Sequence, residues 1–74
     1  MDYGKEIMLA CTSAQKELDA IADYTEKIMS SQDDNMKGVY ANNRLDEIPH
    51  IQGLVIAITA MVNGESPSAA QEVG

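Results

Sequence analysis

Two glutamates and one histidine in this chain have the residue types needed to bind a metal ion. Glu47 and His50 lie three residues apart in the segment RLDEIPHIQGL, which places both side chains on one face if the segment is helical. Glu17 lies in an earlier segment of the chain. Carboxylates bind and neutralise hard divalent cations, and an imidazole adds a nitrogen ligand. Glu17, Glu47 and His50 are therefore candidate metal ligands.

The length of the chain limits how it can be stabilised. Its 74 residues suffice for one domain, and a domain this small usually needs a metal, disulfides or a partner chain. Cys11 is the only cysteine, which excludes a disulfide within the chain and a metal cluster of four thiolates. We expect Cys11 to pack in the interior. With disulfides excluded, the chain can be stabilised by binding a metal or by forming an oligomer.

The charge balance indicates which partners to expect. Five Lys and Arg stand against twelve Asp and Glu, a formal net charge of −7. This argues against nucleic acid or an anionic membrane as a partner, because both attract a basic surface. The start of the chain has no signal-peptide pattern, and the most apolar run, LVIAITAMV, has nine residues where about 20 span a bilayer. We expect a cytoplasmic location and no membrane partner.

The first segment has the periodicity of a packed helix. Steps of three and four residues connect its apolar positions, which predicts a helix over about 4–31. The main row comprises Ile7, Cys11, Ala14, Leu18, Ile21, Thr25 and Ile28. A neighbouring row, from Ala10 to Ile28, is interrupted by Glu17 and continues through Tyr24. The sequence thus predicts one charged side chain on an inward face.

A second helix is predicted over about 34–62. The segment SSQDDN breaks the first helix, and Asp33 or Asp34 is expected to cap the next one. The inward row of the second helix comprises Tyr40, Asn43, Glu47, His50, Leu54, Ala57 and Met61. Pro49 lies within this segment, but the row continues in phase past it and Ile48 would be a poor N-cap for a new helix, so we expect a kinked but continuous helix. Asn63 and Gly64 are typical of a helix C-terminus.

Two long helices joined by a short turn predict an all-α antiparallel hairpin over residues 1–63, followed by a disordered tail over 64–74. A hairpin cannot cover its own apolar groove, so we expect a homodimer that forms a four-helix bundle. The dimer would contain two copies of Glu17 and two Glu47–His50 pairs. This is the ligand set of bundles that bind two iron or two manganese ions.

Two segments resemble the metal-binding helices of ferritin-like proteins. ELDAIADYTEKI at 17–28 resembles the first metal helix of rubrerythrin-like ferritins, and DEIPHIQGL at 46–54 resembles the second. The interval between Glu17 and Glu47 is similar to that of encapsulated ferritins, whose subunit is a two-helix half-ferritin. The resemblance covers about residues 5–63.

The resemblance implies a ferroxidase that oxidises iron(II) for storage or detoxification. It implies metal binding by Glu17, Glu47 and His50 across a homodimer interface, with Tyr24 close to the two metal ions. It also implies a higher, ring-like oligomer and a shell protein that encloses it in a compartment, although the tail SPSAAQEVG lacks the apolar and basic character of a shell-targeting peptide. The ligand types equally fit manganese and the reduction of peroxide.

A second hypothesis belongs to another class of protein. The chain would be a metal-free acidic hairpin that dimerises as an interaction or scaffolding module. Glu47 and His50 would then pair with each other or with Arg44, and Tyr24 would be a core residue. Bound metal, or its absence, separates the two hypotheses.

Overall fold

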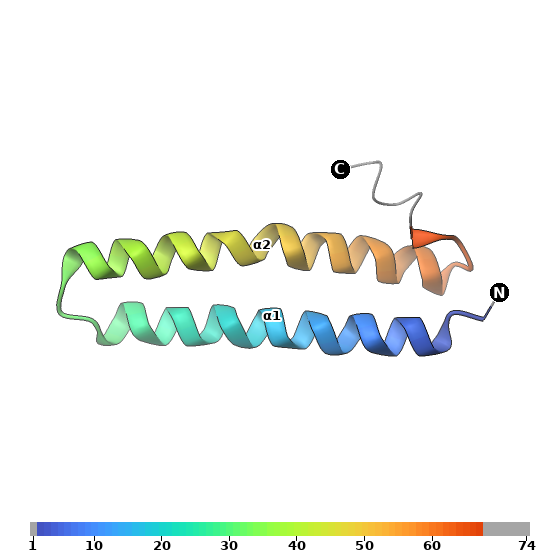
Figure 1. Ribbon diagram of the computed structural model, residues 1–74, viewed down its shortest axis with the longest axis horizontal. Coiled ribbons are helices and arrows are strands. Elements are labelled where there is room, and N and C mark those ends of the chain that lie inside the picture. Colours follow the sequence, from blue (N-terminus) through green and yellow to red (C-terminus); the bar gives the residue numbers. More distant parts are fainter. Residues whose placement is uncertain (1, 68–74) are drawn as a thin grey trace.

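The computed structural model describes residues 2–67, which form two antiparallel α-helices and no strand (Figure 1). Helix α1 spans Gly4–Ser30 and helix α2 spans Asp34–Val62, with a three-residue connection between them. The predicted all-α hairpin is confirmed, and the predicted boundaries of about 4–31 and 34–62 lie within one residue of these bounds. Most of the predicted disordered tail, 68–74, lies outside the described residues.

Local capping explains where helix α2 begins and ends. Asp33 is the N-cap of α2, and its carboxylate accepts hydrogen bonds from the backbone N–H groups of Asn35 and Met36, at 2.8 and 3.1 Å. At the other end Gly64 takes a positive φ of 77°, the left-handed conformation that glycine adopts without strain. The N–H of Glu65 then bonds to the carbonyl of Ala60, at 2.8 Å. Residues 63–65 therefore form an ordered helix-ending turn.

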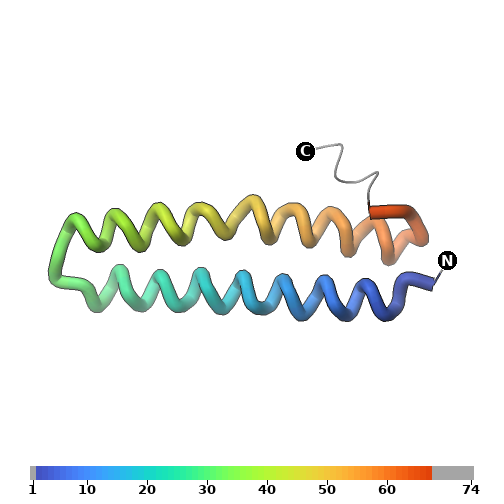
Figure 2. The backbone as a smooth tube through the Cα atoms, in the orientation of Figure 1, coloured from blue at the N-terminus to red at the C-terminus, as the bar shows by residue number. Residues whose placement is uncertain are grey.

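Helix α2 is continuous from Asp34 to Val62 (Figure 2), so the predicted continuity through Pro49 is confirmed, whereas the predicted kink stays a prediction. Proline has no N–H, so the carbonyl of Leu45 loses its usual bond within the helix. Pro49 thus weakens the backbone of α2 between two candidate ligands while keeping both of them on one helix.

The hairpin is about one helix thick and leaves both broad faces uncovered. Its extents are 51 × 22 × 11 Å, and Ala60 and Met61 are the only buried apolar residues in the described part of the chain. Within residues 2–67, eleven large apolar side chains are at least 40% exposed. They are Met8, Leu9, Leu18, Met29, Met36, Val39, Leu45, Ile48, Val55, Ile56 and Val62. Exposed apolar surface on this scale favours association with another molecule.

The inward face of α1 differs from the main row predicted above. Every position of the neighbouring row is half-buried, including Glu17 and Tyr24, whereas the main row is exposed at two of its seven positions. These two positions are Cys11 and Leu18. The prediction that Cys11 packs in the interior is therefore wrong for the single hairpin.

Helix α2 is also the one helix in residues 2–67 that is long and apolar enough to cross a membrane, judged by length and composition alone. Core helices of soluble proteins can pass the same test. The predicted cytoplasmic location and the predicted absence of a membrane partner thus stay predictions.

Candidate metal centre

The antiparallel hairpin brings Glu17, Glu47 and His50 together near its middle. Glu17 comes from α1, while Glu47 and His50 come from successive turns of α2. The Nδ1 atom of His50 lies 3.6 Å from Oε2 of Glu17 and 3.6 Å from Oε2 of Glu47. One ligand atom from each residue lies within 4.8 Å of the other two. The structure thus gathers the three predicted ligands into a single group.

The three side chains differ in exposure. The two carboxylates lie between the helices, with 28% of the Glu17 side chain and 19% of the Glu47 side chain exposed. The His50 side chain is 63% exposed, so it lies at the rim of the layer rather than on the inward row. The contact face of α2 follows Arg44, Glu47, Ile51 and Leu54. A step of three residues from Glu47 falls short of a full turn of 3.6, which carries His50 toward solvent.

Two neighbouring carboxylates make the group electrostatically costly without a cation. The pKa of Glu47 is raised, first because protonated Glu47 can donate a hydrogen bond to the Glu17 carboxylate, then through burial and repulsion by the Glu17 charge. The hydrogen bond from His50 and the charge of His50 lower the pKa of Glu47, but by less than Glu17 and burial raise it. Without a cation, a proton on Glu47 therefore relieves the repulsion between the two carboxylates.

One oxygen atom indicates that the group suits a positive ion. Oε2 of Glu17 is buried and has no hydrogen-bond partner. A buried acceptor without a partner is costly, and a bound cation would satisfy it. Two carboxylates and one imidazole also provide the oxygen and nitrogen ligands that iron(II) and manganese(II) accept. The residues present thus fit a metal site.

Tyr24 lies in the same interhelical layer but outside the ligand group. It is half-buried, seven residues after Glu17, which corresponds to about 10 Å along the helix axis. The amine of Lys27 lies 5.7 Å from the centre of its ring. This position fits both the core role and the role near the metal ions that the sequence left open.

Arg44 makes a contact that the sequence did not predict. Its Nη1 atom donates a hydrogen bond to Oγ1 of Thr25 on α1, at 2.9 Å. Within residues 2–67 Arg44 forms no ion pair, so the pairing with Glu47 or His50 considered in the scaffold hypothesis is absent. The contact between His50 and Glu47 considered there is present, at 3.6 Å. Thr25 lies on the main row predicted for α1, but Arg44 is absent from the inward row predicted for α2, so the periodicity did not indicate their contact.

No protein-family model matches the chain, and no curated protein or solved structure matches it. The assignment of the group as a metal site therefore depends on its geometry and on the chemistry of its side chains.

Proposed function

We propose that two copies of the hairpin pair into a four-helix bundle that binds two iron(II) ions and oxidises them. Iron(II) is the substrate, and the product is iron(III) for storage or detoxification. Each chain would supply Glu17, Glu47 and His50, and the partner copy would supply the same set across a two-fold axis.

One observation carries the proposal: Oε2 of Glu17 is buried without a hydrogen-bond partner, and a second carboxylate and an imidazole lie beside it. A metal-free cluster would satisfy this oxygen only through an added proton, because the Nδ1 atom of His50 lies 3.6 Å away, beyond hydrogen-bond distance. A cation satisfies it and also removes the repulsion that raises the pKa of Glu47. The uncovered faces of the hairpin support pairing with a second copy.

The reaction needs little acid–base chemistry from the protein. Two iron(II) ions lose one electron each, and one peroxide molecule accepts both electrons with two protons to form two water molecules. Dioxygen can take the place of peroxide, accepting two electrons and two protons to form hydrogen peroxide. Carboxylates favour iron(III) over iron(II), because their negative charge stabilises the higher positive charge. Glu17 and Glu47 would thus bind the substrate and favour its oxidation.

A second candidate function is a metal-free dimeric scaffold. The exposed apolar side chains favour it, because they can drive association without any ion. It predicts that the dimer persists in a chelator and in variants of Glu47.

Turnover tests the proposed function. The protein is mixed with iron(II) under nitrogen, air is admitted, and oxygen consumption and iron(III) absorbance are followed. We expect oxidation faster than in buffer, and a loss of more than about tenfold in Glu47→Gln. Asp46→Asn is the matched control, because it removes one negative charge from the adjacent, exposed position. Equal rates in wild type, Glu47→Gln and buffer would contradict the proposal.

A further inference from the structure

Arg44 and Glu47 are neighbours on α2 that do not pair. Residues three apart on a helix lie within reach of each other, and opposite charges at this spacing usually attract. Arg44 instead reaches across to α1 and donates to Thr25, at 2.9 Å. Glu47 approaches His50 rather than Arg44. The side chain of Arg44 is therefore directed away from the candidate ligand nearest to it.

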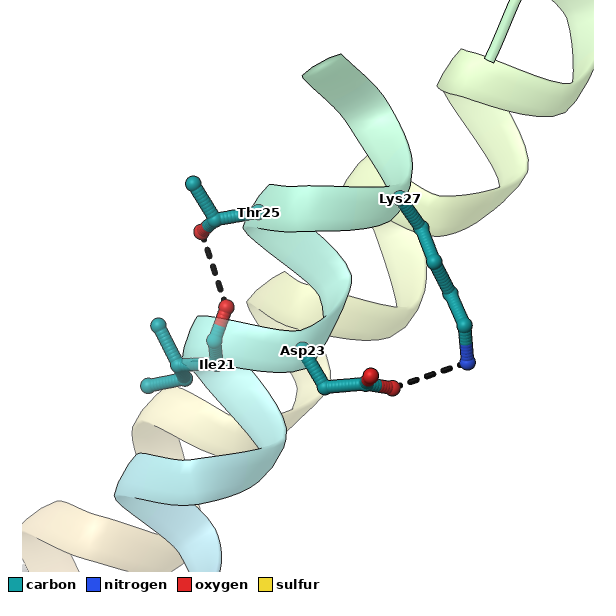
Figure 3. A network of polar contacts seen from close by, with 4 residues as sticks. All are labelled: Ile21, Asp23, Thr25 and Lys27. Carbon is teal, nitrogen blue, oxygen red and sulfur yellow. Dashed lines mark hydrogen bonds and ion pairs between the residues drawn. The ribbon is translucent and has the colours of Figure 1, made fainter. Parts of the chain in front are cut away.

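The hydroxyl oxygen of Thr25 can accept the hydrogen bond from Arg44 because its own hydrogen is already donated elsewhere. Its hydroxyl donates to the backbone carbonyl of Ile21, at 2.8 Å (Figure 3). A hydroxyl has one donor and two acceptor sites, so this bond uses the hydrogen and leaves a lone pair for Arg44. Thr25 and Arg44 are both half-buried, and the guanidinium of Arg44 presents only hydrogen-bond donors. Without Thr25, the guanidinium would need another acceptor nearby.

Glu47 is the acceptor that Arg44 could reach on its own helix. An arginine bound to Glu47 would occupy the carboxylate oxygens and neutralise their charge. A metal ion would then have to displace the arginine before it could bind. In a dimer the competition would occur twice, once in each chain.

We propose that Thr25 is a positioning residue that holds Arg44 away from Glu47 and so keeps this carboxylate free for metal. The inference rests on the proposed metal site and deepens it. It assigns Thr25 a role that neither its exposure nor its place on an inward row indicates.

A comparison of variants tests this role by metal affinity rather than by turnover. Manganese(II), which is not oxidised under nitrogen, is titrated into wild type, Thr25→Val, Thr25→Ser and the double variant Thr25→Val/Arg44→Gln. We expect Thr25→Val to bind about two- to fivefold more weakly, which is the scale of one partly exposed ion pair. Thr25→Ser retains a hydroxyl and should match wild type. The double variant should recover wild-type affinity, because no guanidinium remains to compete.

Several outcomes would overturn the inference. Wild-type affinity in Thr25→Val would show that Arg44 does not compete. Equal weakening in Thr25→Val and the double variant would show that the loss comes from packing. If valine unfolds the hairpin, as circular dichroism would reveal, Thr25→Ala replaces it in both comparisons with the same expectations. A wild-type protein that binds no metal would instead contradict the proposed function, and this inference with it.

Discussion

At the open end of the hairpin the layer between the helices is apolar, and in the middle it is charged. Ala60 and Met61 are buried at the open end, with 7% and 6% of their surface exposed. In the middle, Glu17 and Glu47 occupy the corresponding layer, next to a helix turn weakened by Pro49. The first region removes apolar surface from water, whereas the second holds two acids that repel each other. The same pair of helices therefore contains one region that stabilises the fold and one in which two acids lie close together.

This difference separates the residues that hold the fold from those that carry the proposed function. An interior acid without a counter-ion costs free energy, and such positions are commonly found at functional sites. A binding region with low stability of its own gains more from its ligand than a well-packed core does. We expect metal to stabilise the middle of the hairpin and to leave the apolar end unchanged.

The largest loss of stability should come from the apolar end. Met61→Ala removes a buried side chain and should lower the free energy of unfolding by about 2 to 5 kcal/mol. Urea unfolding followed by circular dichroism measures the change. Gln15→Ala is the control, since Gln15 is an exposed polar residue of α1, and it should change stability by less than about 0.5 kcal/mol. Equal losses in both variants would show that the open end is not the stabilising region.

A gain in stability is expected in the middle. Pro49→Ala restores the backbone N–H that can bond to the carbonyl of Leu45, and should raise the free energy of unfolding by about 2 kcal/mol. Iron per chain should stay the same, because Glu47 and His50 keep their spacing on the helix. Gln52→Ala, at an exposed position of α2 with its N–H intact, is the control. A destabilised Pro49→Ala would mean that the proline fits a bend on which the fold depends.

The connection between the helices should have a smaller effect. Asp33→Ala removes the side chain that caps α2 and should cost about 1 kcal/mol. Thermal unfolding of this variant is compared with that of Gln32→Ala, which lies in the same exposed connection. Metal binding should be the same in both, because the cap lies at the end of α2 and the ligands lie near its middle. A loss of metal in Asp33→Ala would show that the two regions are coupled.

The pH dependence should give the smallest effect, and its sign is distinctive. Because the pKa of Glu47 in the folded chain lies above its usual value of 4.5, the folded state binds more protons than the unfolded state between these two values. Without metal, stability should therefore fall as pH rises from 4.5 through the raised pKa. Melting temperatures in chelator measure this slope, which should be shallower in Glu47→Gln than in the control Asp46→Asn. Identical slopes in the two variants would contradict the interaction between Glu17 and Glu47.

The fold could be predicted because its determinants are local. The segment SSQDDN and the pair Asn63–Gly64 mark helix ends through their own backbone preferences, and the structure places the ends of α1 and α2 there. The approach of Glu17 to Glu47 also follows from periodicity, because both lie on inward rows of helices joined by a short connection.

The inward row of α1 and the hydrogen-bond partner of Arg44 depend on how the two helices pack, which the periodicity of the sequence does not determine. Parallel rows on α1 were almost equally apolar, and only packing against α2 shows that the row through Glu17 faces inward while Cys11 and Leu18 do not. Likewise, the spacing of Arg44 and Glu47 favoured an ion pair within α2, but the hydroxyl of Thr25 on the other helix accepts the hydrogen bond. Contacts between helices decide such competitions, and one sequence does not encode them as a visible pattern.

The most direct test is native mass spectrometry of the protein loaded with iron(II) under nitrogen. We expect a dimer that carries two iron ions, one for each chain, and the loss of iron in Glu17→Ala, Glu47→Ala and His50→Ala. A dimer that carries no iron, or iron that all three variants retain, would contradict the proposed metal site.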